Sequence, residues 1–194
     1  MKISCQGPGP VAIVGRMRIE FTRFAAADAA ALADFLTGEE WPYHAGVQER
    51  EAVLRRAAEG GYDDDGNRTF WIVTGGERVG LVRLQDLDDD TPMFDLRVRA
   101  AWRGKGLGTA AVAWLTRYLF TEFPGIERIE GNTRQDNRAM RAAFRRNGYA
   151  KEAHYRRAWP APDGTRHDTI GYGILRADWE SGEVTPPDWG DELT

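Results

Sequence analysis

The stretch that most constrains this chain is Phe94–Thr109, which reads FDLRVRAAWRGKGLGT. Its first half alternates apolar and charged residues, which is the period of a half-buried strand. The apolar residues that follow fall on one stripe of a helix: Leu107, Ala111, Trp114 and Tyr118. The stretch therefore predicts a strand that passes through a tight turn directly into a helix.

Three glycines in that turn, Gly104, Gly106 and Gly108, let the backbone come close to a ligand and take φ values that other residues avoid. The free N–H groups at the start of a helix form an anion site, and Arg103 and Lys105 add positive charge there. The glycine spacing matches neither a Walker loop nor the dinucleotide fingerprint. We expect a diphosphate-binding turn. The alternative is an ordinary strand-to-helix turn with solvated cations.

Length and charge exclude several classes of protein. With 194 residues, the chain is long enough for one domain with a substantial core. Its net charge of −4 argues against a general nucleic-acid binder, which would carry a basic face. A lone cysteine, Cys5, excludes a disulfide framework or a cysteine-rich zinc site and fits a reducing compartment. No apolar run is long enough to span a membrane. We therefore expect a cytoplasmic protein.

Periodicity and turn residues predict the element order β-α-α-β-β-β-α-β-α-β-β. Strands joined by long helices run parallel and tight hairpins run antiparallel. The prediction is thus an α/β fold with a mixed, mostly antiparallel sheet, a central parallel strand pair and about four helices. Gly–Pro alternation predicts a flexible N-terminal extension over residues 1–16. The domain is expected over residues 17–179, followed by an acidic, proline-containing tail over residues 180–194.

Two motifs carry a resemblance to a known family. The pattern [RQ]-x-x-G-x-[GA], met by Arg103, Gly106 and Gly108, resembles the pyrophosphate motif of the GNAT superfamily of acetyl-CoA-dependent N-acyltransferases. A second segment, from Asp136 to Tyr149, resembles the family's N-x-x-x…G-[FY] motif. The sequence is similar to the branch with the ribosomal-protein alanine acetyltransferases over residues 17–179, and the predicted element order is that of the family.

The resemblance implies acetyl-CoA as co-substrate and no metal. It implies that a backbone N–H near Val98 or Arg99 holds the thioester oxygen, that Arg103 supplies charge, and that Asn137 lies near the pantetheine arm. The backbone donors to the pyrophosphate would come from the glycine turn: Gly104, Lys105, Gly106, Leu107, Gly108 and Thr109.

The proton acceptor has several candidates. An amine must lose a proton before it attacks a thioester. Glu130 occupies the place of a recurrent family glutamate and comes first. The other candidates are Asp95, Glu152, His154 and a water relay. Each of these charged groups is alternatively a solvated or ion-paired charge.

The sequence departs from the family at Phe144, where many members have a tyrosine that protonates the leaving thiolate. Tyr149 and Tyr155 are candidate replacements, although both also suit core packing. The thiolate can also leave unaided.

The loop after the first predicted helix lines the acceptor side in the family. It contains Glu39, Glu40, Trp41, Tyr43 and His44, and carboxylates and aromatic faces suit a cation. We therefore expect Glu39, Glu40, Trp41 and Tyr43 to bind a primary amine. The acceptor classes are a polyamine, an aminosugar and a protein N-terminus. Two alternatives stay open: a non-catalytic acyl-CoA-binding module, and a phosphate-binding enzyme of another kind. Homodimers are common in the family, but no feature of this sequence indicates an interface.

Overall fold

A computed structural model describes residues 11–15, 17–44, 46 and 48–190. The strands are β1 (Val11–Val14), β2 (Met17–Arg23), β3 (Arg68–Thr74), β4 (Glu77–Gln85), β5 (Met93–Val98), β6 (Arg128–Arg134), β7 (Ala150–Pro160) and β8 (Arg166–Leu175). The helices are α1 (Ala29–Thr37), α2 (Arg50–Ala58), α3 (Leu107–Glu122), α4 (Arg138–Arg146) and α5 (Arg176–Ser181), with short 3₁₀ turns η1 (Ala26–Asp28) and η2 (Ala100–Trp102).

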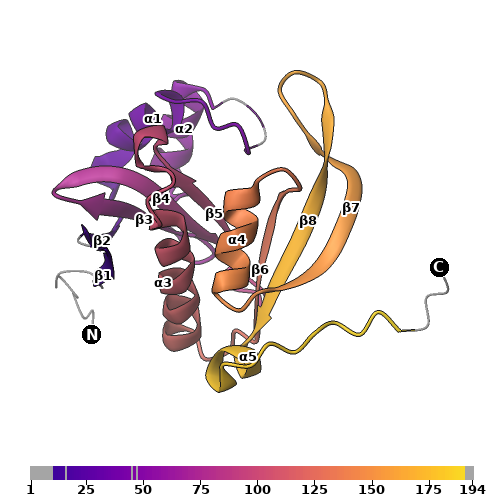
Figure 1. Cartoon of the computed structure of the whole chain (residues 1–194). Helices are drawn as coiled ribbons and strands as arrows, with labels where there is room; N and C mark the ends of the chain where they lie inside the picture. Colours follow the sequence, from indigo (N-terminus) through magenta and orange to yellow (C-terminus); the bar gives the residue numbers. More distant parts are fainter. Residues whose placement is uncertain (1–10, 16, 45, 47, 191–194) are drawn as a thin grey trace.

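The strands form two antiparallel sheets that meet at β5 and β6 (Figure 1). The first sheet has the order β1-β2-β3-β4-β5 and the second the order β6-β8-β7. At their starts β5 and β6 run side by side in the same direction. Arg128 N–H donates to the Asp90 carbonyl at 3.3 Å, and Glu130 N–H donates to the Pro92 carbonyl at 3.0 Å. Beyond that point each strand pairs only within its own sheet, so the predicted parallel pair opens into a wedge.

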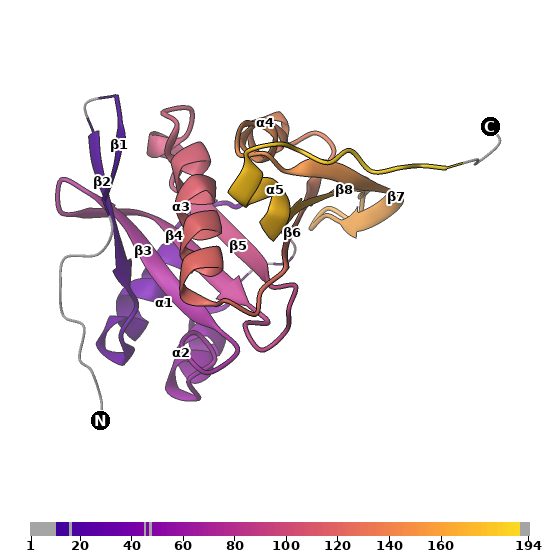
Figure 2. The same cartoon turned by 90° about the horizontal axis from the view of Figure 1, so that it is seen from below.

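The two faces of the first sheet are covered by different helices (Figure 2). Apolar residues of α3 and α4 pack with β2–β6 and β8 in the main core, where the ring of Trp114 stacks on Phe21 with centroids 4.1 Å apart. The helices α1 and α2 cover the opposite face, where Phe35 meets the edge of Trp71. The predicted mixed, mostly antiparallel α/β fold is thus confirmed. Successive residues of β5 face the two opposite helix layers in turn.

Residues 11–14, which the sequence assigned to a loose extension, form β1 instead. This short strand pairs antiparallel with β2, with Val14 opposite Met17. Gly15 has a φ of +60°, which suits a tight hairpin. The partly buried side chains of Ala12 and Val14 pack on the main core. The sequence therefore predicted a loose extension that is too long. The Gly–Pro alternation is followed by a strand of only four residues, which is too short to show a periodic signal. Residues 1–10 and 191–194 lie outside the described residues.

The sequence also did not predict α5. Its first residue, Arg176, donates to the carbonyls of Phe120, Phe123 and Ile126 at 2.8–2.9 Å, so the guanidinium closes the end of α3. This helix has only six residues, which is too short for a hydrophobic period. Among the described residues, none of the helices combines the length and the apolar character that a membrane crossing requires.

Candidate functional site

A cavity of about 490 Å³ lies between the end of β5, the glycine turn, the start of α3 and one face of α4. Its floor is apolar, with Leu96 and Val98 from β5 and Met140 from α4. The predicted cofactor residues that line it are Val98, Arg103, Gly104, Gly106, Leu107, Gly108, Thr109 and Asn137. Most of the predicted cofactor residues therefore lie together around one cavity, which we call the first cavity.

The glycine turn has the backbone geometry of an anion site. Gly104 and Gly106 have φ values of +74° and +85°, a region that favours glycine. Gly106 is the N-cap of α3, and its carbonyl accepts the first helical hydrogen bond from Ala110 at 3.1 Å. The N–H groups of Leu107, Gly108 and Thr109 precede that bond and have no partner within the helix. They are therefore free to donate to an anion in the first cavity.

The cations of the turn have different roles. Arg103 Nε donates to the Val98 carbonyl at 2.9 Å and its guanidinium lies over the Trp41 ring, yet Arg103 still lines the first cavity. Lys105 lies outside that lining, with its ammonium 4.5 Å from the ring centre of Trp102. The sequence missed Arg138 and Arg146 of α4, which also line the cavity. A helical spacing of eight residues could have indicated that they share a face.

Of the two backbone donors predicted for the thioester, the structure leaves one free of the sheet. Arg99 N–H donates to the Val79 carbonyl at 2.9 Å, and the Arg99 side chain bonds the Arg78 carbonyl. Arg99 therefore does not line the first cavity. The Val98 N–H points into the wedge, because every second residue of an edge strand directs its N–H away from the neighbouring strand, here β4. The Arg99 assignment is therefore corrected: pairing with β4 takes its N–H, and the Val98 N–H remains as the candidate donor.

A second cavity of about 270 Å³ opens on the other side of the wedge. Its walls include Asp95 and Arg97 of β5, Asn132 of β6 and Trp159 of β7. The residues shared by the two cavities are Tyr43, His44, Leu96, Asn137 and Met140. The two cavities therefore meet where β5 and β6 part, which is a geometry that lets two ligands approach from opposite faces.

Asn137 is engaged with its own helix at that junction. Its Oδ1 accepts from the Met140 N–H at 3.2 Å as the N-cap of α4, and its Nδ2 donates to Thr133 Oγ1 at 3.1 Å. Both side-chain groups have a partner, so Asn137 shapes the junction through its position.

The predicted acceptor loop divides between the two cavities. Tyr43 lines both, whereas Trp41 lines only the first and donates its indole N–H to the Leu36 carbonyl. Glu39 accepts from the Ala100 N–H at 2.8 Å and from the Arg99 side chain, so it anchors η2 and lines neither cavity. Glu40 is exposed and also lies outside both. The loop itself is fixed by Arg134 of β6, which donates to the Pro42 carbonyl at 2.9 Å.

One carboxylate and one imidazole form a pair at the junction. His44 Nε2 lies 2.9 Å from Asp95 Oδ1, and Arg97 donates to the other oxygen of Asp95 at 2.9–3.0 Å. Burial raises the pKa of Asp95, but the hydrogen bond from His44 and the charge of Arg97 outweigh it, so the pKa lies well below its usual range. Sequence reasoning named His44 in the loop without a role, because only the fold brings it to Asp95.

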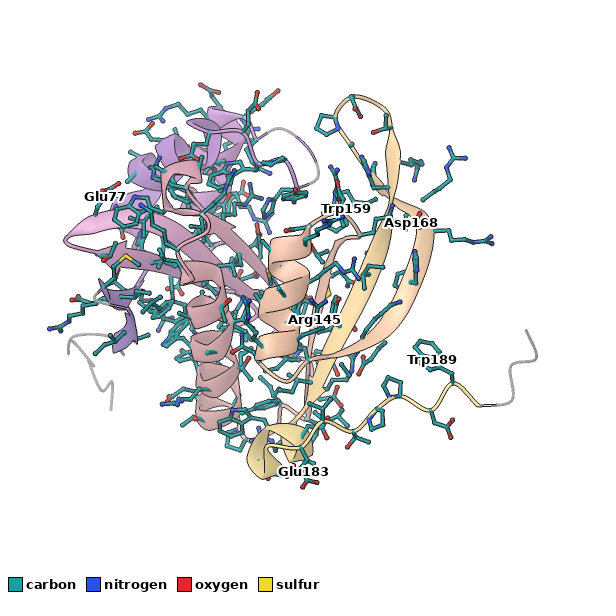
Figure 3. All side chains as sticks on the ribbon, viewed as in Figure 1. Glu77, Arg145, Trp159, Asp168, Glu183 and Trp189 are labelled. Atoms are coloured by element: carbon teal, nitrogen blue, oxygen red, sulfur yellow. The ribbon has the colours of Figure 1, made fainter. Side chains whose placement is uncertain are left out.

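The first candidate base, Glu130, lies in an ion-pair cluster beside the second cavity. It accepts from Arg128 at 2.8 Å and from Asn132 at 2.9 Å, and Arg128 also pairs with Glu152. Burial raises its pKa, but the bonds from Arg128 and Asn132 outweigh this and lower it. Glu130 lines neither cavity and reaches the second one only through Asn132. Glu152 shares its cluster, and His154 pairs with Asp168 on the β7–β8 hairpin, across α4 from α3 (Figure 3).

Neither candidate tyrosine for protonating a thiolate lines a cavity, whereas Phe144, which stands where many family members have that tyrosine, lines the second one. Phe144 is buried and stacks on Tyr172 with centroids 4.7 Å apart, which fits a packing role. The Tyr149 hydroxyl is buried 2.8 Å from Thr116 Oγ1, and burial raises its pKa. Tyr155 is exposed on β7. Of the tyrosines in the described residues, Tyr43 alone lines a cavity. No three metal-ligating side chains gather in the described part of the chain.

An open parallel strand pair, a glycine-rich helix N-terminus on one face and a polar pocket on the other define the class of the acyl-CoA-dependent acyltransferases. The model of the acetyltransferase (GNAT) domain matches residues 18–150, so the chain belongs to the GNAT acetyltransferase family. The family that the sequence resembles is therefore confirmed.

Individual relatives agree with the family. A Bacillus subtilis (strain 168) protein, named "Putative ribosomal N-acetyltransferase YdaF", is 28% identical over 107 residues, which are 54% of this chain and 57% of that protein. The chain thus matches little more than half the length of that relative.

Two solved structures share the fold. One is RimL, a ribosomal L7/L12 alpha-N-protein acetyltransferase in complex with coenzyme A, with a TM-score of 0.72 and 16% identity over 86% of this chain and 98% of that one. The other is a chimera of spermidine N-acetyltransferase SpeG from Vibrio cholerae and hSSAT, with a TM-score of 0.73 and 16% identity over 84% and 98%.

Proposed function

We propose that this protein transfers the acetyl group of acetyl-CoA to a primary amine by direct attack in a ternary complex. The observation that carries the proposal is the meeting of two cavities at the wedge between β5 and β6. A cofactor in the first cavity and an amine in the second would bring their reacting atoms together at Leu96. Such positioning supplies a large part of the rate enhancement in a reaction between two bound substrates.

The first cavity suits the nucleotide end of acetyl-CoA. The N–H groups of Leu107, Gly108 and Thr109 would donate to the pyrophosphate, with charge from Arg103, Arg138 and Arg146. The apolar floor of Leu96, Val98 and Met140 suits the pantetheine arm. The Val98 N–H would then stabilise the negative charge that develops on the thioester oxygen.

The second cavity suits an amine more than an anion. Asp95 supplies a carboxylate, and the rings of Tyr43, Phe94 and Trp159 supply faces that attract cations. Because Asp95 is already paired with Arg97, the cavity has little net charge, so aromatic contact would contribute much of the affinity. The acceptor classes are a polyamine, an aminosugar and a protein N-terminus. The relatives act on proteins and on spermidine according to their names.

The experiment measures the release of free thiol from acetyl-CoA. The acceptors are spermidine, kanamycin, and short peptides that begin with glycine or alanine. Acceptor-dependent thiol release, with an acetylated product in the mass spectrum, is the expected result. If the rate of thiol release is the same with and without each amine, the proposed transferase activity is wrong.

A second candidate is an acyl-CoA-binding module without turnover, which the buried Phe144 in place of a tyrosine favours. It predicts that acetyl-CoA raises the melting temperature while no amine in the panel is acetylated. The same two measurements therefore separate the two candidates.

A further inference from the structure

We propose that His44 is the general base of the acetyl transfer and that Asp95 is its positioning residue. The inference rests on the proposed function and goes beyond it by assigning the proton transfer to one atom, Nδ1 of His44. Neither the family motifs nor the sequence pattern selects this residue, because His44 lies in the loop between α1 and α2, where no periodicity places it.

The position of His44 fits the task. It lines both cavities, so it borders the cofactor side and the acceptor side at once. Its neighbours Pro42 and Tyr43 are held to β6 by the guanidinium of Arg134, which lies 5.2 Å from the ring centre of Tyr43. The indole of Trp41 meets the imidazole edge to face, with centroids 6.1 Å apart. The anchored loop and the Trp41 ring therefore hold the imidazole in place at the junction.

The contact with Asp95 selects the tautomer. Nε2 of His44 lies 2.9 Å from Asp95 Oδ1, and an ionised carboxylate only accepts, so Nε2 carries the proton in the neutral imidazole. Nδ1 then has a free lone pair. Within the described part of the chain, Nδ1 of His44 and Oδ1 of Asp95 are both buried without a well-directed hydrogen bond, so the charge of Asp95 favours the proton on Nε2 through the 2.9 Å contact. A buried acceptor without a donor is costly, and a bound ammonium would supply that donor.

The other charges around His44 are unsuited to the same task. Asp95 is bonded by both His44 and Arg97, and these partners stabilise its ionised form. Arg97 is the positive group on β5, and Arg134 on β6 is paired with Asp136. Glu130 is one hydrogen bond removed from the second cavity. His44 is therefore the group at the junction that can gain a proton while a carboxylate stabilises the resulting charge.

The proposed step balances as follows. The acceptor R–NH3⁺ transfers one proton to Nδ1 of His44, which becomes an imidazolium paired with Asp95. The amine lone pair forms the C–N bond at the thioester carbon, and the C–S bond breaks with its electron pair on sulfur. The second proton of the nitrogen goes to the thiolate, and His44 releases the first to solvent. The products are the acetamide, free CoA and one proton.

The kinetic test compares His44→Gln with His154→Gln. His154 also faces a carboxylate, with Nε2 2.7 Å from Asp168 Oδ2, but it lies on β7 and lines neither cavity. With an amine that the wild type acetylates, His44→Gln should lower kcat/KM by about 10²–10⁴-fold, whereas acetyl-CoA affinity stays the same. The acidic limb of the pH profile should disappear with it. Asp95→Asn should lower kcat with little change in acetyl-CoA affinity, because the imidazole loses the carboxylate that fixes its tautomer. His154→Gln should match the wild type.

A purely structural role predicts a different result. His44→Gln would then lower the melting temperature and acetyl-CoA affinity and leave the pH profile in place, and this outcome would overturn the proposal. Activity of His44→Gln within about threefold of the wild type would overturn it as well.

The tautomer provides a test that needs no turnover. The chain has only three histidines, so the imidazole nitrogens can be assigned by ¹⁵N NMR with the two glutamine variants. Protonated Nε2 and unprotonated Nδ1 on His44 above neutral pH support the proposal. Protonated Nδ1 overturns it. If NMR shows the expected tautomer but the protein acetylates no amine, the result contradicts the proposed function instead.

Discussion

The side chain of Val14 on β1 lies against Gly106 of the glycine turn. A methyl group built on Gly106 would lie only 2.9 Å from Val14 Cγ1. The hairpin of β1 and β2 therefore packs against the turn that is proposed to bind pyrophosphate. Gly106 also has a φ of +85°, so the position excludes a side chain for two independent reasons.

The first prediction is that Gly106→Ala lowers both stability and acetyl-CoA affinity. A non-glycine residue at such a φ costs about 1–2 kcal/mol, and the clash with Val14 adds to this. Thermal unfolding and calorimetric titration with acetyl-CoA measure the two effects. Val14→Ala in the same background should recover the part due to the clash and leave the part due to φ. A variant that melts at the wild-type temperature would disprove the described turn geometry.

The second prediction is the opposite pattern for Gly108→Ala. Gly108 lies in the first turn of α3 with a negative φ, and apart from the adjoining backbone of its own helix no atom lies within 4 Å of the built methyl group. Alanine favours helix over glycine by up to about 1 kcal/mol, so the melting temperature should stay or rise. The pyrophosphate motif admits either glycine or alanine at this position, so acetyl-CoA affinity should stay close to that of the wild type. A large loss of affinity or of stability would contradict the described geometry of the turn.

The strand-to-helix stretch could be predicted because local chemistry determines it. Alternation in β5, the apolar stripe of α3 and the glycine spacing are all short-range signals, and the structure has each element where the sequence placed it. The element order then limited the fold to few arrangements. The short β1 and α5 were missed, because neither is long enough to show a period.

The polar site was predictable only in part. Glu39 looked like a ligand for a cation because it is acidic and lies in the acceptor loop, yet its partners Ala100 and Arg99 are about 60 residues away in sequence, and only the fold reveals them. His44 and Asp95 are separated in the same way. Glu130 was placed on the correct strand, and its ion pair with Arg128 was not visible in the pattern.

The third prediction concerns pH. Because the folded state lowers the pKa of Asp95, ionised Asp95 contributes stability at neutral pH. That contribution should be complete above the unfolded pKa of about 4 and should decrease as pH falls below it, since the unfolded state then binds the proton more readily. Urea unfolding of wild type and Asp95→Asn at pH 7, 5, 4 and 3 measures it. The stability difference should shrink below pH 4. A difference that grows toward pH 3 would have the wrong sign.

The fourth prediction separates two neighbouring glutamates. Glu39→Ala removes the acceptor of the Ala100 N–H and the partner of Arg99, so it should destabilise the fold by about 1–2 kcal/mol. Glu40→Ala changes an exposed side chain and should stay within about 0.5 kcal/mol. Denaturant unfolding compares the two. If the loop instead binds the amine through these carboxylates, both variants will raise the KM for the acceptor at unchanged stability.

The fifth prediction concerns the residue that fixes the acceptor loop. Arg134 is largely buried, bonds the Pro42 carbonyl and lies over the Tyr43 ring. Arg134→Ala should release the loop and raise the KM for the amine by about tenfold, while acetyl-CoA affinity changes little. Arg166→Ala is the matched control, because Arg166 also bonds a backbone carbonyl, that of Arg157, but on the exposed hairpin. Steady-state kinetics with each substrate varied in turn distinguish the two effects. If Arg134→Ala weakens acetyl-CoA and leaves the amine unaffected, the loop belongs to the cofactor side and the second cavity does not hold the acceptor.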